Sequence, residues 1–245
     1  MEFPTIIRYL GENWLNEQIE FIENTFELFN TNNKEENKRV GYKALEEIEK
    51  LLLIFSPLNG IDEWSQEAKK AKKNLNDLLF ELIALSSFVK KSDMIELRRK
   101  TTKGTIPEAL VTKEGKEFYL ECTNLESTPL SIDGKVKKLF NKSTSKFMGV
   151  EGIHLIGILN FNNKSENFRS MIESIEKRFS KGEGKTLIAF MLVNSYFQWV
   201  PNIDKLKLTK EYSIIPNPKK LEKYNIEFLE RLMDVDEFRK IEKLF

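Results

Sequence analysis

The chain has 245 residues, enough for one large domain or a core with an appendage, and it can bury a substantial apolar interior. Its 39 basic and 38 acidic residues give a formal net charge of +1, so the whole chain lacks the basic excess typical of nucleic-acid-binding domains. No secretory leader follows Met1 and no apolar run reaches membrane-spanning length, so we expect a cytoplasmic protein without a membrane partner.

The first third of the chain is predicted to be helical. Apolar residues repeat at helical spacing from Leu15 to Phe29 and again from Arg39 to Phe55, and a third helix runs from Trp64 into the segment around Glu81. We expect residues 1–74 to form an N-terminal helical extension that packs on the chain's own core. A homodimer or a partner protein bound through these helices is the alternative.

The helix around Glu81 is apolar on nearly all sides, which is the pattern of a buried helix. Glu81 shares a helix face with Leu78, Leu85 and Phe88. Burial of a lone carboxylate costs several kcal/mol unless the group is paired or binds a metal. Glu81 is therefore a candidate functional residue.

Residues 108–121 are predicted to form a β-hairpin, because Glu114 and Gly115 suit a tight turn between two runs of strand-forming residues. With these two residues as the loop, Glu108 lies directly across from Glu121. Like charges at opposed positions destabilise a sheet, at side-chain separations of roughly 4.5–5.5 Å, and a divalent cation would compensate. Two solvated glutamates on an exposed face are the alternative interpretation.

The second strand of this hairpin alternates between two faces. One face carries Tyr119, Glu121 and Thr123, and the other carries Phe118, Leu120 and Cys122. The single cysteine, Cys122, is therefore predicted to be a small core residue rather than a nucleophile. The single histidine, His154, lies in an apolar strand, which favours a structural role and excludes a multi-histidine metal site.

Helices and strands are predicted to alternate after the hairpin. The expected order is a helix over 133–148, a strand over 152–161, a helix over 165–180, a strand over 186–193, an edge strand over 212–215 that Pro216 stops, and a terminal helix over 221–245. This alternation predicts an α/β fold with a mixed central sheet flanked by helices, preceded by the N-terminal helical extension.

Lysines form one stripe of the helix expected at 133–148, namely Lys135, Lys138, Lys142 and Lys146. An apolar stripe adjoins it, so the helix is expected to pack with its lysines beside the core. Lys142 or Lys146 would then lean over the rim of the hairpin face. A solvated face whose lysines merely flank the core is the alternative.

Together these features resemble the core of the PD-(D/E)XK, or restriction-endonuclease-like, nuclease superfamily. The resemblance covers residues 75–193 and rests on a helix with Glu81, then Pro107-Glu108, a hairpin and Glu121-Cys122-Thr123. It implies that Glu108 matches the Asp of "PD" and Glu121 the acid of (D/E)-x-K. These two residues would hold Mg²⁺ or Mn²⁺, with Glu81 assisting, in a nuclease-like α/β domain over residues 75–245.

Thr123 departs from the family pattern, because it occupies the position of the family's lysine. That lysine positions and polarises the attacking water, and threonine supplies no positive charge. Some divergent members take the lysine from the following helix, and the resemblance then implies Lys142 or Lys146 as the replacement.

The resemblance implies a Mg²⁺-dependent nuclease that hydrolyses phosphodiester bonds of nucleic acid, DNA in preference to RNA. Restriction or phage defence is the role that it suggests. Two alternatives belong to other classes. One is a catalytically inactive nuclease-like fold that binds nucleic acid or assembles with proteins, which the missing lysine would explain. The other is a protein-interaction module that acts through the N-terminal helices.

Overall fold

The structure is a computed structural model that describes residues 2–24, 34–125, 131–157, 165–200, 205–233 and 239–240. The N-terminal helices are α1 (Pro4–Leu10), α2 (Glu12–Asn24), α3 (Lys34–Phe55), α4 (Ile61–Lys70) and α5 (Leu75–Lys91). The remaining elements are β1 (Met94–Leu97), β2 (Ala109–Lys113), β3 (Lys116–Asn124), α6 (Ile132–Lys146), β4 (Gly152–Gly157), α7 (Ser165–Ser180), β5 (Leu187–Val200), β6 (Lys205–Pro216), the 3-10 helix η2 (Pro218–Lys220), α8 (Ile226–Arg231) and β7 (Arg239–Lys240). Within these segments, no helix is both long and apolar enough to cross a membrane.

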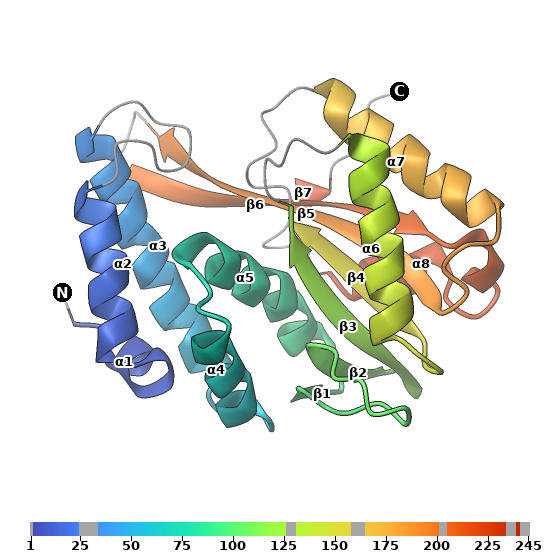
Figure 1. Ribbon diagram of the computed structural model, residues 1–245, viewed down its shortest axis with the longest axis horizontal. Coiled ribbons are helices and arrows are strands. Elements are labelled where there is room, and N and C mark those ends of the chain that lie inside the picture. Colours follow the sequence, from blue (N-terminus) through green and yellow to red (C-terminus); the bar gives the residue numbers. More distant parts are fainter. Residues whose placement is uncertain are drawn as a thin grey trace.

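The described strands form one seven-stranded mixed sheet in the order β1 to β7. β1, β2 and β3 are antiparallel, β3, β4 and β5 are parallel, and β6 runs antiparallel to β5. Helix α5 covers one face of the sheet, whereas α6 and α7 cover the other (Figure 1). The predicted fold class, a mixed α/β sheet flanked by helices with a helical N-terminal region, is confirmed.

The β2–β3 hairpin has the predicted register, with Lys113 opposite Lys116 and Ala109 opposite Leu120. Glu114 and Gly115 form its two-residue loop with φ angles of 51° and 71°. A type I′ hairpin turn needs positive φ at both of these positions, and its twist matches that of the flanking strands. The turn therefore fixes which side chains of β3 face α5 and which face α6.

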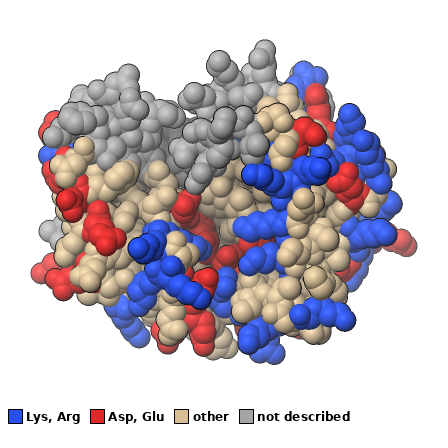
Figure 2. All heavy atoms as spheres, in the orientation of Figure 1, with Lys and Arg blue, Asp and Glu red and all other residues tan. Residues whose placement is uncertain are grey.

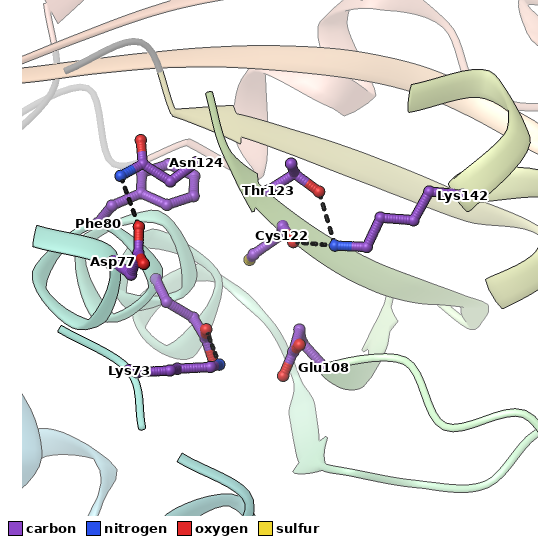
Figure 3. Close-up of a pocket in the computed structure, with 9 residues that line it drawn as sticks. Lys73, Asp77, Phe80, Glu108, Cys122, Thr123, Asn124 and Lys142 are labelled. Atoms are coloured by element: carbon purple, nitrogen blue, oxygen red, sulfur yellow. Dashed lines mark hydrogen bonds and ion pairs between the residues drawn. The ribbon is translucent and has the colours of Figure 1, made fainter. Parts of the chain in front are cut away.

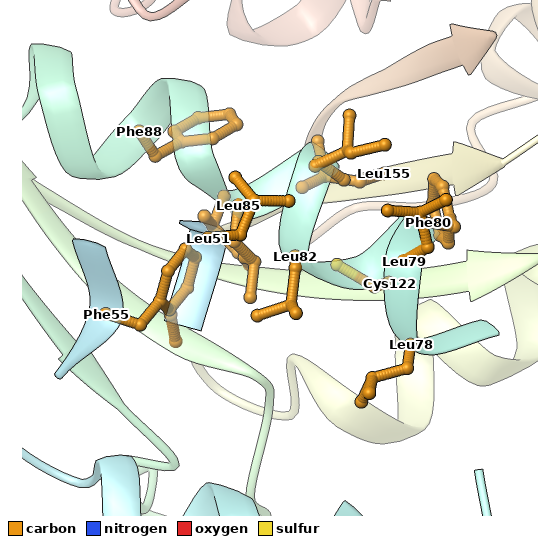
Figure 4. Close-up of a cluster of buried hydrophobic side chains, with 14 of the residues drawn as sticks. Leu51, Phe55, Leu78, Leu79, Phe80, Leu82, Leu85, Phe88, Cys122 and Leu155 are labelled. Carbon is orange, nitrogen blue, oxygen red and sulfur yellow. The ribbon is translucent and has the colours of Figure 1, made fainter. Parts of the chain in front are cut away.

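Helix α5 is the central element of the larger core. Its apolar side chains lie between Leu51 and Phe55 of α3 on one side and Cys122 and Leu155 of the sheet on the other (Figure 4). This single apolar cluster runs from α1 through α5 into the sheet and continues across residue 74. The N-terminal helices thus pack on the chain's own core, and the division into domains at residue 74 stays a prediction.

The prediction of one continuous helix from Trp64 to Glu81 is wrong. The structure has two helices there, because α4 ends at Lys70 and α5 begins at Leu75. Lys72 between them adopts a left-handed φ of 49°, which an α-helix cannot accommodate. Asn74 then caps α5, and its side chain accepts a hydrogen bond from the Asp77 backbone at 2.9 Å. The break turns the chain, and it places Lys73 beside Glu81.

The C-terminal part also differs from the prediction. β6 ends at Pro216 as expected, but the two-residue strand β7 pairs with it in parallel at Glu211 and Tyr212, so β6 is not the last strand of the described sheet. The terminal helix expected over 221–245 is wrong, since α8 is limited to six residues that Asn225 caps. Residues 234–238 and 241–245 lie outside the described part of the chain, as do parts of the predicted segments 15–29 and 152–161.

Gly60 joins the N-terminal helices to the sheet and offers a test of this docking. It has φ +84°, and a Cβ there would clash with the Leu97 carbonyl group, whose carbon lies 2.8 Å away. We expect Gly60→Ala to lower the free energy of unfolding by about 2–5 kcal/mol in urea denaturation, from left-handed strain plus overpacking. Gly104→Ala is the control, because Gly104 has φ +80° and open space around it, which leaves about 1–2 kcal/mol of strain. Equal losses in the two variants would contradict the packing of α4 against β1.

Candidate active site

The sheet has a gap where β3 extends beyond the first residue of β2. β2 begins at Ala109 opposite Leu120, whereas β3 continues to Asn124 and pairs there with β4. The N-terminal half of α5 passes beside the free edge of β3, and α6 lies on the opposite face. A cavity of about 240 Å³ occupies this gap (Figure 3). Side chains from both faces of the sheet can meet in it, because β2 does not separate them.

Three carboxylates lie at this gap and all are buried, with exposures of 5% for Glu81, 7% for Glu108 and 1% for Glu121. They come from α5, from the residue before β2 and from the middle of β3. Three negative charges in one buried region need compensation. Each carboxylate has at least one cation beside it.

Glu81 is held by two groups from the N-terminal helical region. Trp64 Nε1 donates to Glu81 Oε1 at 2.5 Å, and the Lys73 ammonium donates to Glu81 Oε2. Burial, together with the charge of Glu108, raises the pKa of Glu81 to about 7, and Lys73 and Trp64 oppose the shift. Burial lowers the pKa of Lys73, but the carboxylates of Glu81 and Glu108 outweigh it and raise the pKa above its usual value.

Glu108 continues the hairpin ladder by one position, because its backbone N–H donates to the Leu120 carbonyl at 2.9 Å. Its partner is Arg98, whose Nη1 donates to Glu108 Oε2 at 3.1 Å and whose backbone N–H donates to the Glu108 carbonyl at 2.8 Å. Burial alone would raise the pKa of Glu108, but the charges of Lys73 and Arg98, with those of Lys146 and Lys142, outweigh it and lower the pKa below its usual value. The Glu108 carboxylate is therefore ionised at neutral pH.

Glu121 faces α6, which supplies both of its cations. Lys142 Nζ lies 2.9 Å from Glu121 Oε1, and Lys146 Nζ lies 3.7 Å from Glu121 Oε2. Oε2 is buried and accepts no hydrogen bond. Burial and the charge of Glu108 raise the pKa of Glu121, while Lys142 and Lys146 oppose the rise.

Thr123 lies next along the same strand and contacts Lys142, whose Nζ donates to Thr123 Oγ1 at 2.7 Å. Burial, with the charges of Lys142 and Lys146, lowers the pKa of His154 well below its usual value, so the imidazole beside Thr123 is neutral. The structure brings together the six predicted site residues, Glu81, Glu108, Glu121, Thr123, Lys142 and Lys146. Their catalytic and metal-binding roles stay predictions.

Sequence reasoning missed Lys73 and Trp64, which hold Glu81. Lys73 belongs to a run of lysines at the end of α4, and nothing in the sequence distinguishes it from its neighbours. The one available signal was Glu81 itself, because a buried carboxylate demands a nearby cation.

The donor set fits a sparsely coordinated divalent ion. Within the described segments, no group of three or more acidic, histidine or cysteine side chains is arranged to hold a metal ion. Both oxygens of Glu81 are engaged, whereas Glu121 Oε2 is a buried acceptor without a hydrogen bond. Mg²⁺ usually keeps several waters and takes one or two carboxylates plus substrate phosphates. Glu108 and Glu121 suit that role.

The surroundings of the site are basic on two sides. Figure 2 shows Lys and Arg side chains on either side of a hollow in this face, with acidic side chains within it. Lys73, which precedes α5, and Lys142 of α6 line opposite sides of the cavity (Figure 3). A second hollow of about 540 Å³ shares Lys73 with this cavity, and its charged lining also includes Lys69, Lys72, Glu12 and Glu17. The acids thus lie in a trough between cations.

Known proteins show little similarity to this chain. No family model matches it, and no curated protein matches its sequence. Among solved structures, SfsA of Pyrococcus furiosus in complex with Ca²⁺ is similar over 56% of this chain, at 7% identity and a TM-score of 0.24. The match spans 59% of that protein's length. A likeness this slight carries no argument, so the chemistry rests on the site.

The pKa of Glu81 has a consequence for stability. It rises from 4.5 to about 7 on folding, so the folded state binds this proton more tightly. The stabilisation is complete below about pH 4.5 and is lost as the pH rises through about 7. Glu81→Gln cannot titrate, so we expect wild type to lose up to about 3 kcal/mol relative to this variant between pH 4 and pH 8 in urea denaturation.

Glu63→Gln is the control for this experiment, because it removes an exposed carboxylate from α4. Its free energy of unfolding should follow that of wild type at every pH. Parallel pH curves for wild type and Glu81→Gln would contradict the raised pKa.

Proposed function

We propose that this protein is a metal-dependent nuclease that hydrolyses phosphodiester bonds of nucleic acid. The observation that carries the proposal is the burial of Glu108 and Glu121 close to each other at the gap in the sheet, where Glu108 and Lys142 line an open cavity and Lys142 lies 2.9 Å from Glu121. Carboxylates that face each other in a basic trough combine ligands for a hard cation with charges that attract phosphate. The sequence resemblance to PD-(D/E)XK nucleases supports the same conclusion.

In this proposal Glu108 and Glu121 hold Mg²⁺ or Mn²⁺, which when bound lowers the pKa of a water and neutralises the phosphate. The Glu81 carboxylate assists by its electrostatic interaction with Glu108. Its own position is fixed by Trp64 and Lys73. Lys142 supplies the positive charge that Thr123 lacks, and Lys146 adds a second one.

The proposed substrate is a nucleic-acid strand, because cations line both sides of the acidic trough (Figure 2). Lysines that track a backbone neutralise phosphates whatever the base sequence. We take DNA as the first substrate to test, and restriction or phage defence as the role to examine, on the strength of the sequence resemblance alone.

A second candidate function follows from the ion pairs. Each of the three carboxylates already has a cation beside it, so the charge network is balanced without a metal. Such a network suits a nuclease-like fold that has lost catalysis and binds nucleic acid or assembles with other proteins or a second copy. Binding of nucleic acid in the presence of a chelator, without cleavage in Mg²⁺ or Mn²⁺, would favour this candidate.

The direct test is cleavage of several DNA and RNA substrates in Mg²⁺ and in Mn²⁺. We expect wild type to cleave, and Lys142→Ala to cleave roughly 10²–10³-fold more slowly, the effect typical for loss of one group that stabilises charge in a transition state. Lys137→Ala is the matched control, because it removes an equal charge from an exposed position of α6. Cleavage that survives both Lys142→Ala and Lys146→Ala would refute the role given to these lysines.

Metal binding is tested separately by thermal unfolding. A ligand that binds the folded state alone raises the melting temperature with its concentration. We expect Mg²⁺ or Mn²⁺ to raise the melting temperature of wild type, and Glu121→Gln to abolish the rise because it removes a ligand charge. Glu63→Gln should keep the full response. A melting temperature indifferent to both ions would count against the metal site.

A further inference from the structure

Lys142 is anchored by three consecutive residues of β3. Its Nζ donates to Thr123 Oγ1 at 2.7 Å and to the Cys122 carbonyl at 2.9 Å, and it lies 2.9 Å from Glu121 Oε1. An ammonium group has three N–H donors, so these three acceptors engage all of them. Figure 3 shows the side chain reaching from α6 to the strand. The Glu121-Cys122-Thr123 element thus binds a lysine where the nuclease pattern would carry one.

The Cys122 carbonyl is free for this contact because β2 has ended. The Leu120 carbonyl accepts from the Glu108 backbone N–H, so it faces the β2 side of β3. Carbonyls two residues apart along a strand point the same way, so that of Cys122 faces this edge too. Lys142 satisfies it in place of a neighbouring strand.

The Thr123 hydroxyl is itself held by His154. Thr123 Oγ1 lies 2.8 Å from His154 Nε2, and Ser143 Oγ lies 2.6 Å from His154 Nδ1. Ser143 also donates its single hydroxyl hydrogen to the Leu139 carbonyl at 2.7 Å. Its oxygen therefore accepts from Nδ1–H, which leaves Nε2 of the neutral ring as an acceptor.

This assignment sets the direction of the remaining hydrogen bonds. Thr123 donates its hydroxyl hydrogen to Nε2, and its lone pairs then face the Lys142 ammonium. The opposite tautomer would need the Ser143 hydrogen at Nδ1 and would break the bond to Leu139. The hydrogen bonds that link Leu139, Ser143, His154, Thr123 and Lys142 can therefore all form with only one arrangement of donors and acceptors.

We propose that His154 is a positioning residue for Lys142 and acts through Thr123. A lysine side chain has many accessible rotamers, so it needs fixed acceptors to hold its charge at one place. A rotating hydroxyl is a poor anchor for a cation. The Thr123 hydroxyl hydrogen must point away from the Lys142 ammonium, and its hydrogen bond to His154 Nε2 keeps it in that direction. This inference rests on the proposed function in one respect, namely that Lys142 is the cation of the site.

The position of His154 supports this role. It lies opposite Glu121 in the parallel β3–β4 ladder and is fully buried. Its ring packs against Phe190 with centroids 5.6 Å apart, so it cannot swing away. Ser143 and Lys142 are neighbours on α6, and both ends of the hydrogen-bond chain therefore fix this helix on the sheet.

The experiment follows the Lys142 ammonium directly, by NMR of the metal-free protein labelled with ¹⁵N-lysine, with Lys142→Arg to assign the signal. Thr123→Val keeps the shape of the side chain and removes the hydroxyl. We expect its Lys142 protons to exchange with water at least tenfold faster than those of wild type. Thr123→Ser restores the acceptor and should recover slow exchange. Thr144→Val removes a hydroxyl that donates to the Phe140 carbonyl on the same helix, and should change nothing.

Two substitutions of His154 test the relay, by which we mean the hydrogen bonds from Ser143 through His154 and Thr123 to Lys142. His154→Phe keeps a buried ring without an acceptor and should speed exchange as Thr123→Val does, while His154→Gln keeps an acceptor near the Nε2 position and should preserve slow exchange. The double variant with Thr123→Val should show no further effect, because both substitutions break one chain. If His154→Phe does not fold, His154→Asn replaces it, since it also lacks an acceptor at that position.

These results separate the relay from the proposed function. Fast exchange in Thr123→Val and His154→Phe supports the relay even if wild type cleaves no nucleic acid. Where wild type does cleave, the same two variants should lose roughly 10–100-fold in kcat with KM little changed, and Thr123→Ser should recover most of it. Slow exchange that survives the loss of either hydrogen-bond partner would overturn the proposal, as would additive effects in the double variant.

Discussion

The burial of three carboxylates in one gap of the sheet is the constraint on which the site depends. Removing an ion from water costs several kcal/mol, and like charges add to that cost. The structure meets it with four cations, Lys73, Arg98, Lys142 and Lys146, which come from three separate parts of the chain. The ion pairs hold the segment before α5 on α5, the end of β1 on the start of β2, and α6 on β3. Loss of Lys73 or Arg98 would leave a buried carboxylate without its ion-pair partner.

The N-terminal helices take part in this balance. Trp64 of α4 and Lys73 after it hold Glu81, and α2 holds the Lys73 backbone in turn, because Trp14 Nε1 donates to the Lys73 carbonyl at 2.8 Å. The apolar core is continuous through the same region. A helical region that positions a cation at the site is part of its machinery, so removal of the N-terminal helices would disturb the charges as well as the packing.

What the sequence predicted well was local. Two turn residues and a period of two specify the hairpin register, and an apolar helix reveals the burial of Glu81, because both signals lie within about twenty residues. The cations of Glu81 and Glu108 escaped prediction because each is one of many similar residues and only tertiary packing selects it. The break before α5 was missed because the lysine-rich run at 69–73 keeps good helix propensity, and propensity yields to packing. The C-terminal strand β7 depends on pairing with a distant partner, which no local pattern reveals.

Glu121 and Lys142 form an ion pair that uses one oxygen of the carboxylate. Glu121 Oε1 bonds the ammonium, while Oε2 accepts no hydrogen bond. A carboxylate that shares its charge with a second cation binds the first less strongly, because the two cations repel each other. On the proposed function, Glu121 would hold Lys142 less tightly when it also holds a metal ion, and one N–H of the ammonium would be free for a phosphate oxygen.

Thr123 and the Cys122 carbonyl would keep their bonds to Lys142 in that case, so the ammonium would turn toward the substrate without leaving the strand. A lysine carried by the strand itself would need no such anchor. A lysine borrowed from α6 needs acceptors that do not depend on Glu121. The hydroxyl held by His154 and the carbonyl freed by the end of β2 are the two that the fold provides.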